Sequence, residues 1–226
     1  MPDQLSWIAI YPDLLLLVMS CLVLLVDLAV KGARRTPTYT LSLVTLLVVA
    51  GLQAYYALSG EVIYGWGNMV VSDTMGNWLK CFAAIATGVT LVYGRNYAAE
   101  RDMLRGGELF ILALFALLGI NIMISANNLL IIYLGLELLT LASYALVALR
   151  RDSALATEAA MKYFVLGALA SGFLLYGMSM LYGTTGTLDI NEIAAALNNM
   201  AGMPFVLILA LVFIVAGLAF KPVSLY

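Results

Sequence analysis

The chain has 226 residues, of which 64% are hydrophobic and only 11% are charged, and its formal net charge is −2. A soluble domain carries about 25% charged residues, so this composition excludes an ordinary water-soluble enzyme and indicates a protein that folds in lipid. The near-neutral charge, with no basic tract, also gives no sign of nucleic-acid binding, and the absence of histidine removes a common ligand of haem and zinc.

Seven apolar stretches follow one another along the chain, and each approaches the roughly 20 residues that a membrane span needs. Backbone polar groups in lipid must be paired within their own segment, so we expect each stretch to be a helix. The expected spans cover residues 9–30, 38–59, 74–96, 108–125, 128–149, 158–182 and 203–221. The predicted fold is therefore all-α: a polytopic transmembrane helix bundle that forms a single domain, with room for a short surface helix in the loop 183–202.

The loop charges predict how this bundle is oriented. The first eight residues carry no positive charge, so the first span is not a cleavable signal. The basic residues outside the spans follow the first, third and fifth spans: Lys31, Arg34, Arg35, Arg95, Arg101, Arg105, Arg150 and Arg151. The loops on the other face contain no lysine or arginine, so the positive-inside rule predicts a periplasmic N-terminus and a cytoplasmic C-terminus in a bacterial inner membrane.

Few ionisable groups lie inside the spans, where they are costly and usually functional. Glu137 is the strongest candidate, because it lies near the middle of the fifth span with no charged residue within ten positions on either side. A carboxylate in lipid needs a cation, hydrogen bonds or a proton. Glu137 is therefore predicted to exchange protons, and the alternative is a neutral, hydrogen-bonded structural glutamic acid.

Two lysines are candidate partners for this carboxylate. Lys162 lies near the start of the sixth span, where a partly desolvated lysine can exchange protons; alternatively, it forms a surface pair with Glu158, four residues earlier on the same helix face. Lys221 ends the seventh apolar run, and position alone also allows a simple interfacial lysine.

We assign no chemical role to the remaining charged and thiol groups of the spans. Asp13 and Asp27 lie near the two ends of the first span, and Lys80 lies about two turns into the third, where snorkelling explains it. Cys21 and Cys81 lie in apolar runs without a second cysteine nearby, so we expect buried thiols rather than a metal or redox site.

The order of the motifs resembles the antiporter-like membrane subunits of respiratory complex I, and within them the subunit N branch. The matching motifs are Gly135-Leu-Glu137-Leu, Arg150-Arg151, Glu158-Ala-Ala-Met-Lys162, Gly217-Leu-Ala-Phe-Lys221, Tyr11-Pro-Asp13 and Ser171-Gly-Phe-Leu-Leu-Tyr-Gly-Met178. The resemblance implies a proton-translocating subunit of NADH–quinone oxidoreductase, with Glu137, Lys162 and Lys221 on its charged axis. It also implies that flavin, iron–sulfur clusters and quinone belong to partner subunits, and that this chain holds no cofactor or metal.

The chain departs from the family's pattern after Lys221. The family's seventh helix is broken and continues, whereas here residues 222–226 read Pro-Val-Ser-Leu-Tyr. We therefore expect a truncated version of a longer protein, an inactive fragment that contains the N-terminal half of the antiporter-like fold. Two alternatives stay open: a subunit of an Mrp-type cation/proton antiporter, and a structural membrane subunit without a proton path.

Overall fold

The structure is a computed structural model that describes residues 4–30, 32, 35–101, 103–200, 202 and 204–223. Lys31 and Arg34, which contribute to the predicted orientation, and residues 224–226, where the chain departs from the family pattern, lie outside the described residues. The helices are α1 (Gln4–Ala29), α2 (Thr36–Ser59), α3 (Thr74–Glu100), α4 (Glu108–Ser125), α5 (Leu129–Val147), α6 (Ala154–Thr185), α7 (Ile190–Asn198) and α8 (Phe205–Val223).

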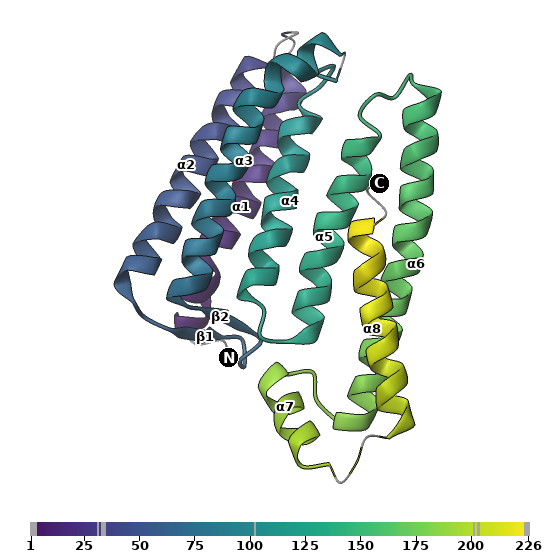
Figure 1. The fold of residues 1–226 in the computed structure, drawn as a ribbon. Helices are drawn as coiled ribbons and strands as arrows, with labels where there is room; N and C mark the ends of the chain where they lie inside the picture. Colours follow the sequence, from purple (N-terminus) through teal and green to yellow (C-terminus); the bar gives the residue numbers. More distant parts are fainter. Residues whose placement is uncertain are drawn as a thin grey trace.

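The predicted all-α architecture is confirmed, and a helix occupies each predicted apolar stretch (Figure 1). Within the described residues, α1 to α6 are long and apolar enough to cross a membrane, whereas the apolar part of α8, Phe205–Lys221, is shorter. The seventh span therefore stays a prediction. The short helix expected in the loop 183–202 is present as α7, which packs on the end of α6 and is otherwise largely exposed.

Two groups of helices make up the described fold. Helices α1 to α4 pack as antiparallel neighbours around one apolar core that includes Leu16, Val49, Phe110 and Leu114, while α6 and α8 form the closest helix pair. Helix α5 lies between these groups and contacts both α4 and α6 (Figure 1). This position of α5 places its side chains at the junction of the two groups.

A small hairpin, which the sequence analysis did not predict, covers one end of the first group. Strands β1 (Ile63–Gly65) and β2 (Val70–Ser72) pair in antiparallel fashion, with Tyr64 opposite Val71. Trp66 and Asn68 adopt positive φ in the turn between them. Three-residue strands are too short to show a period of two, which explains why the pattern did not indicate them.

Glycines set the closest helix contacts. A side chain on Gly119 of α4 would place its Cβ atom 2.7 Å from the carbonyl oxygen of Gly135 on α5. On the other side, a Cβ atom at Gly217 of α8 would lie 2.8 Å from the Ala170 carbonyl oxygen of α6. Small residues at such crossings let helix backbones approach one another in a membrane. Gly172 of α6 is different, because nothing lies within 4 Å of the position of a Cβ atom there.

The two cysteines differ in their surroundings. Cys81 of α3 is buried, as expected, whereas Cys21 lies on the outward face of α1, so the prediction that both thiols are buried is wrong for Cys21. The reason is the helical period: an apolar run does not reveal which of its residues face the core when the surroundings are lipid, since both faces are apolar.

Candidate functional site: a charged centre between α5, α6 and α8

Glu137 lies at the ninth of the 19 positions of α5, far from either end of the helix. Helix α5 begins where the Asn128 side chain accepts a hydrogen bond from the Leu130 N–H, which is a standard N-cap. The continuous apolar sequence after the cap leaves the Glu137 side chain as the acidic group of this helix. Its carboxylate must therefore find polar partners on other helices.

Two neighbouring helices supply those partners. The Glu137 Oε2 atom accepts a hydrogen bond from the Ser171 hydroxyl of α6 at 2.7 Å and one from the Lys221 ammonium of α8 at 3.0 Å. Lys221 also donates to the Thr140 hydroxyl of α5 at 3.2 Å. The Lys221 side chain is 6% exposed and that of Glu137 is 25% exposed, so this is a largely buried ion pair.

The arrangement depends on how closely α8 approaches α6. Gly217 lies one helical turn before Lys221 and packs against the α6 backbone near Ala170, which is next to Ser171. Gly177 of α6 makes the matching contact farther along, where a Cβ atom would lie 2.8 Å from the Ala210 carbonyl oxygen. These two glycines hold Lys221 beside Glu137, which lies in the middle of α5. Lys221 is therefore not an interfacial lysine in this structure.

The geometry permits proton exchange within the centre. A lysine and a carboxylate in direct hydrogen-bond contact can be present as an ion pair or, after transfer of one proton, as a neutral pair. In a medium of low polarity the balance between these forms depends on nearby charges. The Ser171 and Thr140 hydroxyls can each donate and accept a hydrogen bond, which lets them follow either form.

Lys162, the third candidate of the sequence analysis, does not join this centre. Its ammonium pairs with the Glu158 carboxylate at 2.5 Å, and the side chains of Lys162 and Glu158 are 70% and 61% exposed. Lys162 lies nine residues before Ser171 on α6, which is about 14 Å along the helix axis. The interpretation of Lys162 as the direct partner of Glu137 is thus replaced by the Glu158–Lys162 surface pair, and a longer-range role of Lys162 stays a prediction.

Ser171 and Thr140 are the members of the centre to which sequence reasoning assigned no function. Thr140 lies three residues after Glu137 and therefore on the same helix face, which is a signal that could have indicated it. Ser171 appeared in the sequence analysis only as the first residue of a motif that resembles the family. In the structure Gly167 packs against Tyr144 of α5, while Ser171 reaches the carboxylate.

A second buried ion pair lies within the first group of helices. The Lys80 ammonium of α3 contacts Asp13 Oδ2 of α1 at 2.7 Å, and the two side chains are 3% and 10% exposed. The interpretation of Lys80 as a snorkelling residue and of Asp13 as interfacial is therefore wrong. An acidic and a basic group that are buried inside a helix bundle are stabilised by pairing, as they would be in lipid. The two residues are 67 positions apart, so the sequence alone does not indicate that they form a pair.

Asp27 also has defined partners, at the opposite end of α1. Its carboxylate accepts hydrogen bonds from the Thr38 hydroxyl at 2.6 Å and from the Gly107 N–H at 2.9 Å, and Arg35 lies 3.5 Å away. Arg35 in turn donates to the Arg105 carbonyl oxygen. These contacts join the loops after α1 and α3, so basic loops far apart in sequence meet at one end of the bundle.

The part of the chain that matches a known family contains the charged centre. Residues 126–225, which include the whole charged centre, match the family described as NADH:quinone oxidoreductase/Mrp antiporter, TM. The chain is 67% identical over 221 residues to NADH-quinone oxidoreductase subunit N of Polaromonas naphthalenivorans. Nearly the whole chain therefore resembles subunit N. The alignment covers 98% of this chain and 44% of the relative, so the chain spans less than half the length of the curated relatives it matches.

Solved structures agree with this family. A chain of the respiratory complex I from Thermus thermophilus with bound aureothin is similar with a TM-score of 0.69 and 28% identity, over 93% of this chain and 43% of that chain. A chain of the Mrp complex from Dietzia sp. also has a TM-score of 0.69, over 96% of this chain and 41% of that chain, but at 22% identity the likeness shows the fold alone. The likeness to subunit N, together with the six long apolar helices of the described residues, indicates a multi-pass membrane protein.

The groups that make up the centre indicate which chemistry it could support. Among the described residues, histidine, cysteine, aspartate and glutamate do not gather in groups of three or more that could hold a metal ion. The charged centre itself offers one carboxylate, one ammonium and two hydroxyls. Such groups can hold and pass protons, and this is the chemistry that the functional proposal uses.

Proposed function

We propose that this chain forms the proton-handling part of a membrane subunit of NADH–quinone oxidoreductase, in which Glu137 and Lys221 exchange a proton across the α5–α8 contact. The observation that carries the proposal is the 3.0 Å contact between the Lys221 ammonium and the Glu137 carboxylate in the middle of the bundle. Ionisable residues at such depth are expensive and mark proton relays. The 67% identity to a subunit N supports the assignment to this oxidoreductase.

The proposed mechanism is coupled titration. A charge that approaches or leaves one member of the pair changes the proton affinity of the other, so a change elsewhere in the complex can drive proton uptake and release at the centre. Lys162 is proposed as a further relay member toward the basic end of α6, reached through intervening groups rather than by direct contact. Electron transfer from NADH to quinone is assigned to partner subunits of the same complex, together with flavin, iron–sulfur clusters and quinone.

The location follows from the loop charges. The Arg35, Arg105 and Arg151 loops meet at one end of the bundle through contacts that include the Arg35–Arg105 hydrogen bond and the Arg151–Glu108 ion pair. We assign this end to the cytoplasm and the hairpin end to the periplasm of a bacterial inner membrane. An Mrp-type antiporter remains the competing assignment, because the matched family description includes both classes.

Glu137→Gln tests the proposal in the assembled oxidoreductase that carries this segment. The amide can still accept hydrogen bonds from Ser171 and Lys221 but cannot hold a proton at neutral pH. NADH-driven acidification of inverted membrane vesicles is expected to fall at least about tenfold, since a positioned proton-transfer group contributes 10²–10⁴-fold to a rate. NADH oxidation with an artificial electron acceptor reports whether the complex is assembled.

Glu61→Gln is the matched control, because it removes an exposed carboxylate before β1 that lies outside the centre and outside the Glu158–Lys162 pair. Pumping is expected to stay near wild type in this variant. If Glu137→Gln pumps normally in an assembled complex, the chain is a structural subunit and the proposal fails. Sodium- or potassium-driven proton exchange without dependence on NADH favours the Mrp-type assignment instead.

A further inference from the structure

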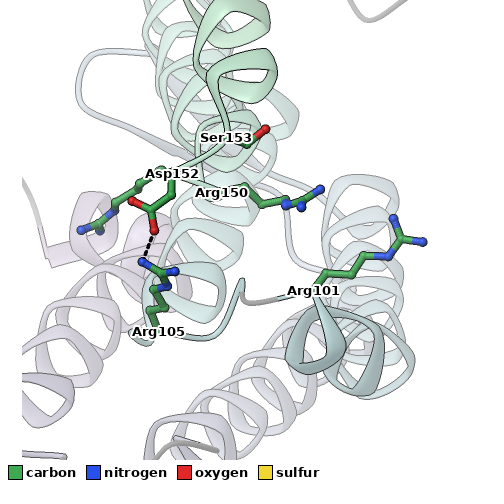
Figure 2. A pocket seen from close by; sticks show the side chains of 6 residues that line it. Arg101, Arg105, Arg150, Asp152 and Ser153 are labelled. Carbon is green, nitrogen blue, oxygen red and sulfur yellow. Dashed lines mark ion pairs between the residues drawn. The ribbon is translucent and has the colours of Figure 1, made fainter.

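A basic pocket lies at the end of the bundle where the α3–α4 and α5–α6 loops meet (Figure 2). It has a volume of about 320 Å³ and opens to the surface. Four arginines, one aspartate and one serine line it: Arg101, Arg105, Arg150, Arg151, Asp152 and Ser153. Four guanidinium groups around one carboxylate leave the pocket strongly positive, which favours an anionic ligand.

The arginines differ in how far they are already neutralised. Arg105 forms an ion pair with Asp152, drawn as the dashed line in Figure 2, and Arg151 pairs with Glu108 at 2.5 Å. Within the described ranges, Arg101 and Arg150 form no ion pair with a carboxylate, although the Arg101 guanidinium lies 4.3 Å from the centre of the Tyr97 ring. These two guanidinium groups therefore remain available to an anion.

The start of α6 adds to the positive potential of the pocket. Helix α6 has 32 residues and begins directly after Ser153, whose side chain accepts a hydrogen bond from the Ala156 N–H. The unpaired N–H groups and the macrodipole of a helix N-terminus favour negative charge nearby. This contribution supports the arginines, which carry the main charge.

An apolar groove begins where the basic pocket ends. The groove has a volume of about 430 Å³ and runs between α4 and α5, where Leu112, Phe115, Ala145 and Ala148 line it. Arg151 lines both the groove and the basic pocket, so the two cavities share a wall at the charged end. The basic pocket suits a phosphate group, and the adjoining apolar groove suits an acyl chain. A membrane phospholipid combines these two parts in one molecule.

We propose that this composite site binds an anionic phospholipid of the cytoplasmic leaflet, with its phosphate at Arg101 and Arg150 and one acyl chain in the α4–α5 groove. Guanidinium groups hold phosphate oxygens by paired, charge-assisted hydrogen bonds. Basic pockets between transmembrane helices on the cytoplasmic side suit such headgroups. The bound lipid fills the space between α4 and α5 and ties the first group of helices to α5, which carries Glu137.

Lipid retention by the purified full chain tests the proposal. The protein in mild detergent is mixed with phosphatidylglycerol or phosphatidylcholine, and native mass spectrometry measures the fraction that keeps one lipid. Wild type is expected to keep phosphatidylglycerol in clear preference. Each of Arg101→Gln and Arg150→Gln is expected to lower retention about fivefold, and the double variant about 25-fold, since each cation near a lipid surface contributes about 1 kcal/mol.

Matched variants separate charge, groove and folding. Arg101→Lys with Arg150→Lys keeps the charge and should retain most of the lipid, and Arg95→Gln removes a cation at the same end that does not line the pocket. Ala145→Phe fills the groove and should lower retention, whereas Leu134→Phe, an exposed position on the same helix, should not. Size-exclusion chromatography and far-UV circular dichroism confirm that each variant is folded.

Three results overturn the proposal. Equal retention of phosphatidylcholine and phosphatidylglycerol shows that the arginines do not select the headgroup. Undiminished retention by folded Arg101→Gln, Arg150→Gln protein, or by Ala145→Phe, removes the pocket or the groove from the site. Displacement by millimolar inorganic phosphate without any preference for lipid over phosphate identifies a simple anion site instead.

Discussion

Two buried lysine–carboxylate pairs occur among the residues that the structure describes, and they differ in their surroundings. Asp13 and Lys80 join α1 and α3 inside the first group of helices, with side chains that are 10% and 3% exposed. Glu137 and Lys221 join α5 and α8, and each makes a further hydrogen bond to a hydroxyl, from Ser171 and to Thr140. One oxygen of Asp13, Oδ1, is buried without a hydrogen-bond partner among the described residues.

We use this difference to distinguish a proposed structural pair from the proposed relay pair. A proton relay needs neighbours that can donate and accept as the charge changes, and the α5–α8 pair has two hydroxyls in this position. The α1–α3 pair has a direct contact only, in the better enclosed of the two sites. We therefore interpret Asp13–Lys80 as a clamp that fixes α1 to α3, although burial alone singles it out more strongly than Glu137.

The largest effect on stability is expected when this clamp loses one partner. Lys80→Met leaves the Asp13 carboxylate buried and unpaired, which should lower the free energy of unfolding by about 3–5 kcal/mol. Thermal unfolding of the detergent-solubilised protein measures the loss. Asp13→Leu combined with Lys80→Met removes both charges and is expected to restore stability to within about 1 kcal/mol of wild type. A double variant as unstable as Lys80→Met contradicts the interpretation as an isolated pair.

A smaller effect is expected when α8 is moved away from α6. In Gly217→Ala the new methyl group would lie 2.8 Å from the Ala170 carbonyl oxygen, so α8 must shift, at a cost of about 1–3 kcal/mol. The shift also lengthens the Lys221–Glu137 contact, so pumping should fall together with stability. Gly172→Ala, where nothing lies within 4 Å, should be neutral or about 1 kcal/mol more stable. Equal effects of both changes contradict the proposed close approach.

The smallest effect on stability is expected at the surface pair of α6. Lys162→Met breaks an exposed pair at i and i+4, which contributes about 0.3–0.5 kcal/mol. The melting temperature should therefore hardly change. A loss of NADH-driven pumping in this stable variant supports the relay role of Lys162 that the family resemblance implies. Normal pumping restricts the relay to Glu137 and Lys221.

The spans and the acidic centre were predictable because lipid imposes simple rules. Continuous apolar runs predict helices, and a lone carboxylate within such a run stands out whatever its partners are. The hairpin at residues 63–72 was missed because its strands have three residues each. Lys80 was misinterpreted because the same position in a span suits both a snorkelling side chain and a buried partner on another helix.

The amino-acid sequence alone determined that the chain folds in a membrane, where most of its helices lie, and that Glu137 is an isolated carboxylate within an apolar helix. These features depend on composition and on periodicity along one segment. Only the tertiary structure decided that Lys221 and not Lys162 contacts Glu137, and that Lys80 belongs to Asp13. Which lysine pairs with which carboxylate depends on which helix faces meet. Close contacts between residues far apart in the chain, such as Gly217 and Ala170, determine how these faces meet.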